Sequence, residues 1–441
     1  MCGIVGYIGN KPAVDILLDG LEQLEYRGYD SSGIAVKCPE EIKVYKAEGK
    51  LKNLREELAP HAYEISKSTL GIGHIRWATH GAPTVVNAHP HTCGCGKLVV
   101  VHNGIIENYK ELKAELEAKG CKFRSQTDTE TVAHLVALIY GEVKDLTKAV
   151  QMATKRLEGA YALCIMHNDE PNKLVATKRN APLVVGVGEN EYYVASDVPA
   201  IIKHTNKAIY IKDNQVVTLT PNSLKLEDEF GGEIIPKAEV LPWEPVALSK
   251  MGFKHFMLKE IHEQPDVIRN ILIGKLHTSD SPIVLDEVKL TKEHLRKLNR
   301  IQVIACGTSL HAAMVGKYII ESFCGIPVDV EASSEYIYRK TVTDEHTLVI
   351  GVSQSGETAD TLTAIKQAKS KGSHVLIITN RPDSTMAREA DSLIPVSAGI
   401  EVSVAATKSY IAQLTSFYLL ALYMAEIKES MPTKELNDIK A

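Results

Sequence analysis

Cys2 follows the first methionine directly, and this position can give it a chemistry that an internal cysteine lacks. If Met1 is removed, a single residue carries both a thiol and an α-amino group. The amine has a pKa of about 7.7–8, so near neutral pH it can accept the proton of the neighbouring thiol. Cys2 is therefore a candidate nucleophile that needs no second side chain as its base, although position alone favours an ordinary small residue.

Asn103 and Gly104 lie between two apolar runs, residues 98–101 and 105–106. An Asn-Gly pair in this setting is typical of a β-hairpin turn, which is the favoured interpretation. The functional alternative is an oxyanion hole, because the asparagine amide and the glycine backbone N–H can both donate to a developing negative oxygen.

Arg76 and Asp128 are a cation and an anion with two possible uses each. Arg76 can grip a substrate carboxylate with two parallel hydrogen bonds, or it can form a structural ion pair. Asp128 lies in Thr-Asp-Thr-Glu at 127–130, which fits a capping box before an expected helix over 132–139. The local pattern therefore favours a helix-start acid at Asp128.

A cluster of possible metal ligands lies between these motifs, and it comprises His89, His91, Cys93 and Cys95. The C-x-C spacing differs from the usual C-x₂-C of zinc sites, and the flanking glycines suit a loop tip. We expect no metal and no cofactor.

Two hydroxyl-rich loops stand out in the second half. Val-Ser-Gln-Ser-Gly-Glu-Thr at 352–358 lies between an expected strand and an expected helix, and Cys-Gly-Thr-Ser at 306–309 follows a neighbouring strand. Hydroxyls together with the N–H groups of a helix start can bind an anion, while a serine-capped helix start is the structural alternative. Because no Gly-Lys-Ser/Thr follows, a sugar phosphate fits better than a nucleoside triphosphate.

The elements that must position these residues differ between the two halves. Residues 1–240 contain many short apolar runs and few helices, which predicts sheets packed on each other and covered by helices. From residue 300 onward short buried strands alternate with helices, which predicts a doubly wound parallel sheet with ligands at its carboxyl ends. Two prolines in Leu-Pro-Trp-Glu-Pro at 241–245 favour an extended linker.

These patterns give four segments: residues 1–240, a linker and connecting helix over 241–289, the parallel domain over 290–430, and an end segment over 431–441. The long helix expected from about Val404 is apolar on every side. Either another domain or subunit covers it, or it is a central core helix.

Composition narrows the class of protein. The chain has 441 residues, enough for two or three domains, with 50 Lys and Arg against 55 Asp and Glu. This balance argues against a nucleic-acid or anionic-membrane surface. Eight scattered cysteines and the lack of a signal-peptide pattern predict reduced thiols in a cytoplasmic protein.

The first half resembles the glutaminase domain of class II, N-terminal-nucleophile glutamine amidotransferases. The resemblance covers about residues 2–240 and lies in motifs that occur in this order: Met-Cys-Gly-Ile-Val-Gly at 1–6, Tyr-Arg-Gly-Tyr-Asp-Ser-Ser-Gly at 26–33, Gly-His-Ile-Arg-Trp-Ala-Thr-His-Gly at 73–81, Asn-Ala-His-Pro-His at 87–91, His-Asn-Gly at 102–104 and Thr-Asp-Thr-Glu at 127–130. It implies an αββα sandwich.

The resemblance also implies roles for these residues. Cys2 matches the nucleophile, Asn103 and Gly104 match the oxyanion hole, Arg76 matches the grip on the substrate α-carboxylate, and Asp128 matches the holder of its ammonium group. The pocket and its gate would be shaped by Arg27, Gly28, Trp77, Thr79, His80 and His89. The Cys-Gly-Cys sequence at 93–95 is not part of the motif and stays unassigned.

Residues 290–430 resemble the sugar isomerase (SIS) domain. Glutaminase, linker and SIS domain follow one another as in the glucosamine-6-phosphate synthase family, and residues 255–265 resemble its connecting segment, with His262 in place of an expected tyrosine. The resemblance implies glutamine and fructose 6-phosphate as substrates and a homodimer through the SIS domain. The sugar-phosphate site would comprise Thr308, Ser353, Gln354, Ser355 and Thr358, with Cys306, Ser309 and Val404 nearby.

One departure concerns the end of the chain. The family carries a second SIS domain and a C-terminal tail with its isomerisation residues, and this chain ends at Ala441. We expect it to hydrolyse glutamine without forming glucosamine 6-phosphate on its own. Two alternatives stay open: a sugar-phosphate-sensing protein with a silent first domain, and another class II amidotransferase such as one that acts on phosphoribosyl pyrophosphate.

Overall fold

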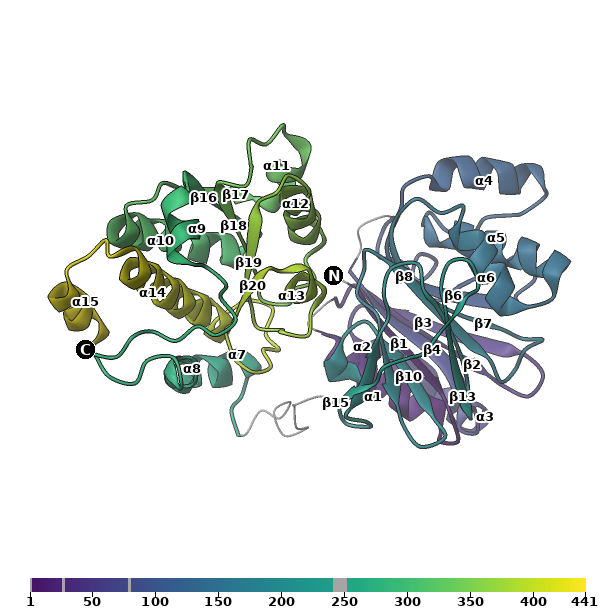
Figure 1. Ribbon diagram of the computed structural model, residues 1–441. Coiled ribbons are helices and arrows are strands. Elements are labelled where there is room, and N and C mark those ends of the chain that lie inside the picture. Colours follow the sequence, from purple (N-terminus) through teal and green to yellow (C-terminus); the bar gives the residue numbers. More distant parts are fainter. Residues whose placement is uncertain (1, 26–27, 78–80, 241–251) are drawn as a thin grey trace. The chain divides into compact units, whose positions relative to one another are not determined.

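The structure is a computed structural model that describes residues 2–25, 28–77, 81–240 and 252–441 (Figure 1). The chain forms two compact units, Met1–Val246 and Ala247–Ala441, and each is described by itself. The predicted linker at 241–245 lies outside the described residues.

The first unit contains two antiparallel sheets. One has the strand order β15-β11-β9-β10-β1-β4-β2-β3 and the other β14-β13-β12-β8-β7-β6-β5. The strands of the first sheet are β1 (Gly3–Ile8), β2 (Ser31–Lys37), β3 (Ile42–Glu48), β4 (Leu70–Arg76), β9 (Val184–Val187), β10 (Tyr192–Ala195), β11 (Lys207–Tyr210) and β15 (Glu239–Val240). Those of the second are β5 (His91–Thr92), β6 (Leu98–Ile106), β7 (Gly159–His167), β8 (Leu174–Arg179), β12 (Val216–Thr220), β13 (Ser223–Glu227) and β14 (Glu233–Ile234).

The two sheets pack face to face, because side chains of both meet in one buried core. Ile4 and Ile72 of the first sheet share it with Val101 and Cys164 of the second. The outer face of the second sheet packs against α4 (Tyr109–Ala118), α5 (Thr129–Val143) and α6 (Leu146–Thr154). On the other side, α1 (Ala13–Gln23) packs on β1 and β4, and α2 (Leu51–Leu58) packs on β3, followed by the short helices η2 (Ala59–His61) and α3 (Ala62–Ile65). The predicted αββα sandwich is confirmed.

The predicted hairpin turn at Asn103-Gly104 is wrong. Both residues lie inside β6, which continues through them and pairs with β7, with Asn103 opposite Ala162 and Gly104 opposite Tyr161. Gly104 has a φ of +123°, and a Cβ atom there would come within 2.0 Å of the Ala160 carbonyl oxygen. Glycine is needed at this point for a twisted strand with a close neighbour and not for a turn.

The second unit is built on a fully parallel sheet with the order β17-β16-β18-β19-β20. Its strands are β16 (Arg300–Ala305), β17 (Val328–Ala332), β18 (Thr347–Ser353), β19 (His374–Thr379) and β20 (Ser392–Pro395). The chain order along this sheet is 2-1-3-4-5, so the direction of winding reverses between β16 and β18. In doubly wound sheets this reversal opens the ligand crevice at the carboxyl ends of the strands.

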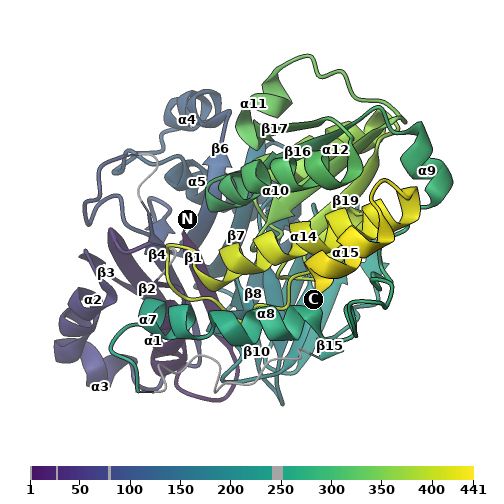
Figure 2. The ribbon, with the colours of Figure 1, turned by 90° about the vertical axis from the view of Figure 1, so that its left-hand side faces the viewer.

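Helices cover both faces of this sheet, as the sequence predicts. One face packs against α10 (Thr308–Cys324) and α14 (Lys408–Lys428), which Figure 2 shows in front of the strands, and α8 (Gln264–Leu272) packs on α14. The other packs against α11 (Ser333–Tyr338), α12 (Ala359–Ser370) and α13 (Thr385–Glu389). The remaining helices are α7 (Phe256–His262), α9 (Lys292–Lys297) and α15 (Thr433–Lys440); Val198–Ala200 in the first unit is a single 3₁₀ turn, η3.

α14 is the apolar helix for which the sequence allowed two interpretations, a helix covered by another domain or subunit and a central core helix. It is long and apolar enough to cross a membrane, but more than half of its most apolar stretch is buried inside this unit. Phe417 lies so close to Gly316 of α10 that a Cβ atom at Gly316 would come within 2.5 Å of its ring. The structure therefore makes α14 a core helix of the parallel domain.

Candidate active site

Cys2 is positioned by the pairing of β1 with β4. Gly3 lies opposite Ile75, so Cys2, which precedes β1, is next to Trp77, which follows β4. The sulfur lies 3.4 Å from both the backbone nitrogen and the backbone oxygen of Trp77. The sulfur can therefore accept from the Trp77 N–H and, as a thiol, donate to the Trp77 carbonyl oxygen.

Asn103 brings the second sheet to the same point. Its amide nitrogen donates to the Cys2 carbonyl oxygen at 3.2 Å, and its amide oxygen lies 3.0 Å from His74 Nε2. Burial lowers the pKa of His74 to about 3, so the ring is neutral near pH 7. Because an amide oxygen only accepts hydrogen bonds, Nε2 must carry the ring proton, and this contact aims the amide N–H groups of Asn103 toward Cys2.

His74 is a residue that the sequence analysis missed. It lies two positions before Arg76 in β4, so both side chains point to the same face of the sheet. That spacing was a usable signal, but the partner of His74 comes from the other sheet and could not be read from the sequence.

Arg76 is 4% exposed and lies in the same cluster. Its guanidinium donates to the carbonyl oxygens of Gly81 and Ala82, each at 3.2 Å. Burial lowers the pKa of Arg76, and the charges of Cys2 and Asp128 act in the opposite direction. The cation is therefore near both the candidate nucleophile and the candidate ammonium holder.

Asp128 does not cap its helix as the sequence predicted. It stands at the residue before α5, but its side chain makes no cap hydrogen bond. Its carboxylate instead accepts from the backbone N–H of Ile106 at 2.8 Å, which ties it to the end of β6. Glu130, in the first turn of α5, accepts from the backbone N–H groups of Arg124 and Ser125, which precede the helix. Asp128 thus stands at the helix start, as predicted, but its side chain does not make the capping hydrogen bond.

The histidines that suggested a metal site bind one another and two threonines. The His89 ring stacks on His74 with 4.1 Å between ring centres, and its Nδ1 accepts from the backbone N–H of His102 at 3.2 Å. His91 Nε2 lies 3.0 Å from Thr127 Oγ1, and His102 Nδ1 lies 2.8 Å from Thr129 Oγ1. Burial lowers the pKa of all these rings. No three His, Cys, Asp or Glu side chains converge as metal ligands in the described part of the chain.

The other predicted glutamine-site residues fall into three groups. Gly28 lies flat against the backbone of residues 76 and 77, where a Cβ atom would come within 2.8 Å of it. Trp77 is 41% exposed and packs edge-on against Tyr29, while His89 is buried and stacks on His74. Arg27, Thr79 and His80 lie outside the described residues.

The sugar-phosphate loops of the second unit lie where its sheet reverses direction. Ala305 at the end of β16 pairs with Val352 in β18, so the two hydroxyl-rich loops leave neighbouring strand ends. Thr308 is the exposed first residue of α10, and Gly307 before it has a φ of +58°. The topology therefore brings together the two loops that the sequence singled out.

The loop after β18 is held by its own hydroxyl groups. Ser353 Oγ accepts from the backbone N–H of Gly356 at 3.0 Å and lies 2.9 Å from Thr358 Oγ1. Ser355 Oγ accepts from the backbone N–H of Glu357 at 3.2 Å. The backbone carbonyl of Gln354 accepts from Asn380 N–H at 3.3 Å, which fixes the loop to the next strand end.

Ser309, Cys306 and Val404 were predicted to lie near the phosphate loop. Ser309 is buried, and its hydroxyl accepts from Gln413 of α14 at 3.0 Å. Cys306 Sγ lies 3.8 Å from Thr361 Oγ1. Val404 is 74% exposed on the loop before α14. The Ser309 hydroxyl thus bonds to α14, whereas Ser353, which is also buried, bonds within its own loop.

The sequence analysis also missed the carboxylates that hold the loop of Val404. Glu260 of α7 is 2% exposed and accepts from the backbone N–H groups of Val402 and Ser403 at 2.6 and 3.1 Å. Glu401 accepts from the backbone N–H groups of Thr407 and Ser409. The connecting segment thereby positions a loop of the parallel domain, and both partners lie in the second unit.

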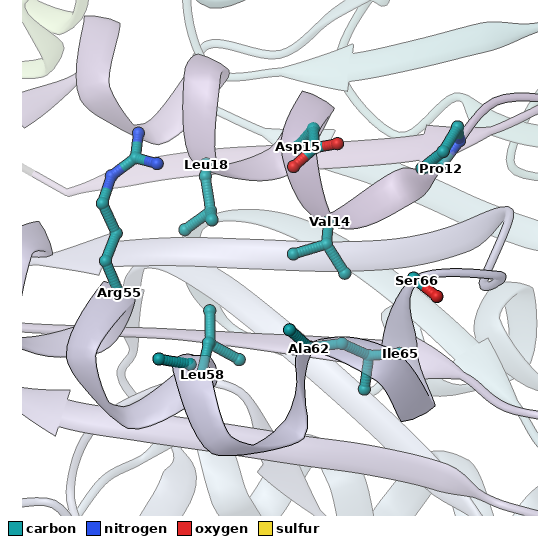
Figure 3. A pocket seen from close by; sticks show the side chains of 10 residues that line it. Pro12, Val14, Asp15, Leu18, Arg55, Leu58, Ala62, Ile65 and Ser66 are labelled. Atoms are coloured by element: carbon teal, nitrogen blue, oxygen red, sulfur yellow. The ribbon is translucent and has the colours of Figure 1, made fainter.

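An apolar hollow of about 340 Å³ lies elsewhere in the first unit, between α1 and the segment from α2 to α3 (Figure 3). Val14, Leu18, Leu58 and Ile65 line it, with Asp15 and Arg55 at its edge. None of the predicted site residues contributes to it.

The fold and the cluster around Cys2 define a class II, N-terminal-nucleophile glutamine amidotransferase joined to a parallel sugar-phosphate domain. The model of the glutamine amidotransferase domain matches residues 83–203, and that of the SIS domain matches residues 294–423. The chain belongs to the glutamine–fructose-6-phosphate aminotransferase (isomerizing) family. It is 47% identical over 440 residues to the enzyme of that name from Clostridium tetani, covering 100% of this chain and 71% of the relative. The corresponding enzyme of Symbiobacterium thermophilum is 47% identical over 426 residues, covering 97% and 69%.

Solved structures also match parts of the chain. The C-terminal domain of glucosamine-fructose-6-phosphate aminotransferase from Francisella tularensis is 38% identical and covers 44% of this chain and 54% of that one, with a TM-score of 0.41. Glutamine phosphoribosylpyrophosphate amidotransferase from B. subtilis is 18% identical, covers 94% and 96%, and has a TM-score of 0.47.

Proposed function

We propose that this chain hydrolyses glutamine at Cys2 and binds fructose 6-phosphate at the crevice between β16 and β18. The family carries out the glutamine-dependent amination of fructose 6-phosphate, and a glutamine amidotransferase domain and a SIS domain are matched here. The observation that carries the glutaminase half is the convergence of Cys2, Asn103, Arg76 and Asp128, which come from both sheets of the sandwich.

In this proposal the Cys2 thiolate attacks the side-chain amide carbon of glutamine. The carbonyl oxygen becomes an oxyanion, which the amide of Asn103 and the backbone N–H of Gly104 stabilise. Collapse of the intermediate expels ammonia after the amine has received a proton, and a glutamyl thioester remains. Water then attacks the thioester, releases glutamate and restores the thiol. The α-amine of Cys2, once Met1 is removed, accepts the thiol proton and returns it to the leaving ammonia.

Arg76 and Asp128 hold the two charges of the amino acid. Glutamine carries an α-carboxylate and an α-ammonium group, so a site that orients it needs one cation and one anion at a fixed spacing. Both residues are nearly buried, which strengthens their attraction for the substrate charges relative to water.

The second unit supplies the sugar-phosphate site in this proposal. Thr308, Ser353, Gln354, Ser355 and Thr358 bind the phosphate of fructose 6-phosphate with hydroxyl groups and with the N–H groups at the starts of α10 and α12. The support is their placement on two loops at neighbouring strand ends.

We also propose a homodimer through the SIS domain and a cytoplasmic location. Met314, Tyr318 and Tyr418 on α10 and α14 keep much of their apolar surface exposed, and a second copy would cover it. The molar mass in solution, measured by light scattering, tests the dimer; a monomer contradicts it.

The test of the glutaminase half compares the chain with its Cys2→Ala variant. The expected result is glutamate release that falls by about 10⁴-fold or more, because the variant has no nucleophile. Cys121→Ala is the matched control, since Cys121 is also a partly exposed thiol. An electrophilic glutamine analogue should label Cys2, and intact mass should show that Met1 is absent.

Fructose 6-phosphate binding, measured by calorimetry, should survive in Cys2→Ala. Glutamate release that persists in this variant contradicts the proposal.

A further inference from the structure

The Cys-Gly-Cys sequence at 93–95 forms the turn between β5 and β6, and it brings two thiols together. The Sγ atoms of Cys93 and Cys95 lie 3.0 Å apart. The backbone N–H of Cys93 donates to the Leu98 carbonyl at 3.1 Å, and that of Gly96 donates to the Cys93 carbonyl at 3.0 Å. The turn therefore holds both sulfurs in contact.

The two thiols differ in their surroundings. Cys93 is 3% exposed and its sulfur accepts from the backbone N–H of Leu98 at 3.4 Å, whereas Cys95 is exposed. Burial and the neighbouring Cys95 raise the pKa of the Cys93 thiol, so it stays protonated near pH 7. An oxidant in solution therefore meets Cys95 first, with Cys93 behind it as a resolving thiol.

Two simpler interpretations leave Cys95 unexplained. A buried cysteine such as Cys93 can serve as a small apolar side chain, but an exposed Cys95 contributes nothing to a core. Metal binding needs further ligands, and the two histidines near the turn have other partners: His91 lies 3.0 Å from Thr127 Oγ1, and His134, beside Gly94, lies 3.7 Å from Glu130. In the described part of the chain no group of three potential ligands forms.

We propose that Cys93 and Cys95 form a reversible intramolecular disulfide and make this turn a thiol–disulfide redox site. With a peroxide as oxidant, the Cys95 thiolate attacks one peroxide oxygen and becomes a sulfenic acid as hydroxide leaves. The Cys93 sulfur then attacks the Cys95 sulfur and expels water. Overall two thiols and one hydrogen peroxide give one disulfide and two waters, so the peroxide takes up both electrons. A low-molecular-weight thiol reverses the reaction by exchange.

The local backbone can take up this change. The sulfurs must approach by about 1 Å, because an S–S bond is about 2.05 Å long. Gly94 separates the two cysteines, and Gly96 after them has a φ of +73° with no atom within 4 Å of an added Cβ. The pairing of His91 with Val100 lies beyond the turn, so β5 and β6 stay paired.

The experiment uses the whole chain and its Cys95→Ser variant, because the exposed Cys95 can be changed with little risk to folding. The reduced protein is treated with hydrogen peroxide or with oxidised glutathione, and its intact mass is measured. The expected result is a loss of about 2 Da, two fewer alkylatable thiols, and a peptide in which residues 93 and 95 are linked. Dithiothreitol should restore the original mass.

Cys95→Ser should retain its mass or gain a single oxygen or glutathione adduct, while the control Cys121→Ala should lose 2 Da like the parent chain. The proposal is overturned if the parent chain gains only adducts, if the link involves Cys2 or Cys121, or if Cys95→Ser still loses 2 Da. None of these readouts depends on glutamine hydrolysis, so the outcome is independent of the proposed function.

Discussion

The two candidate sites use opposite ways of placing polar groups. The glutamine site is built from side chains that reach one another across two sheets, as in the chain of contacts from His74 to Asn103 to Cys2. The sugar-phosphate site is built from one type of local element, a strand end followed by a helix start, used twice. In the glutamine site each function rests on one side chain. In the sugar-phosphate site the hydrogen bonds are distributed over several hydroxyl and N–H groups. Single substitutions should therefore damage the first site far more than the second.

The largest effect that tests this contrast is expected at Asn103. Asn103→Ala should lower kcat for glutamine hydrolysis by about 10²–10³-fold, the range typical for the loss of an oxyanion donor, with a smaller change in KM. The rate of glutamate release over a range of glutamine concentrations measures both constants.

His74 should act through Asn103 as a positioning residue. His74→Ala should reduce kcat by about tenfold or more, while His74→Gln, which keeps a neutral donor, should restore part of the loss. An unchanged kcat in His74→Ala would show that the imidazole contact does not set the orientation of the amide.

Acid should destabilise the first unit more than the second. Burial lowers the pKa of His74 from its ordinary value near 6.5 to about 3. Between these two values the unfolded chain binds a proton that the folded chain does not, so stability is complete above pH 6.5 and is lost as pH falls toward 3. At about pH 5 this histidine alone should lower the free energy of unfolding by about 2 kcal/mol relative to pH 7.

Hydrogen exchange read separately for the two units, at pH 7 and pH 5, measures this difference. His89, His91 and His102 should add to the effect. Burial also lowers the pKa of His374 in the second unit, but that ring is only partly buried. His74→Gln should weaken the pH dependence of the first unit. Equal acid sensitivity in both units would remove the proposed link to the buried histidines.

The smallest effect is expected in the phosphate loop. Ser355→Ala should weaken fructose 6-phosphate binding about tenfold, since one hydrogen bond to a charged group contributes about 1.5 kcal/mol net at the low end, and the neighbouring hydroxyl and N–H groups still hold the phosphate. Thr358→Ala should cost more, because Thr358 also contacts Ser353 within the loop. Calorimetry measures both, with Ser370→Ala at the far end of α12 as the control. A loss of 100-fold or more in Ser355→Ala would contradict a distributed site.

The sequence predicted the second unit closely because its repeated strand–loop–helix pattern is set by neighbouring residues. Each buried apolar run followed by a hydroxyl-rich loop and a helix can be recognised within a few residues, as at 347–358, where the structure has β18 and the start of α12. The topological switch then follows from general rules for parallel sheets. The first unit was predicted only as a class of fold, because its strand order joins segments far apart in the chain.

Residue types and their spacing determined which side chains are candidates: an N-terminal cysteine, a cation, an anion and an Asn-Gly pair. Only the tertiary structure decided what each one does. Asn103-Gly104 lies in a strand because β7 pairs with it, and Asp128 turns from its helix because the N–H of Ile106 lies within reach. His74 and Glu260 were missed for the same reason. A contact between residues distant in the chain leaves no local pattern, since only folding brings the partners together.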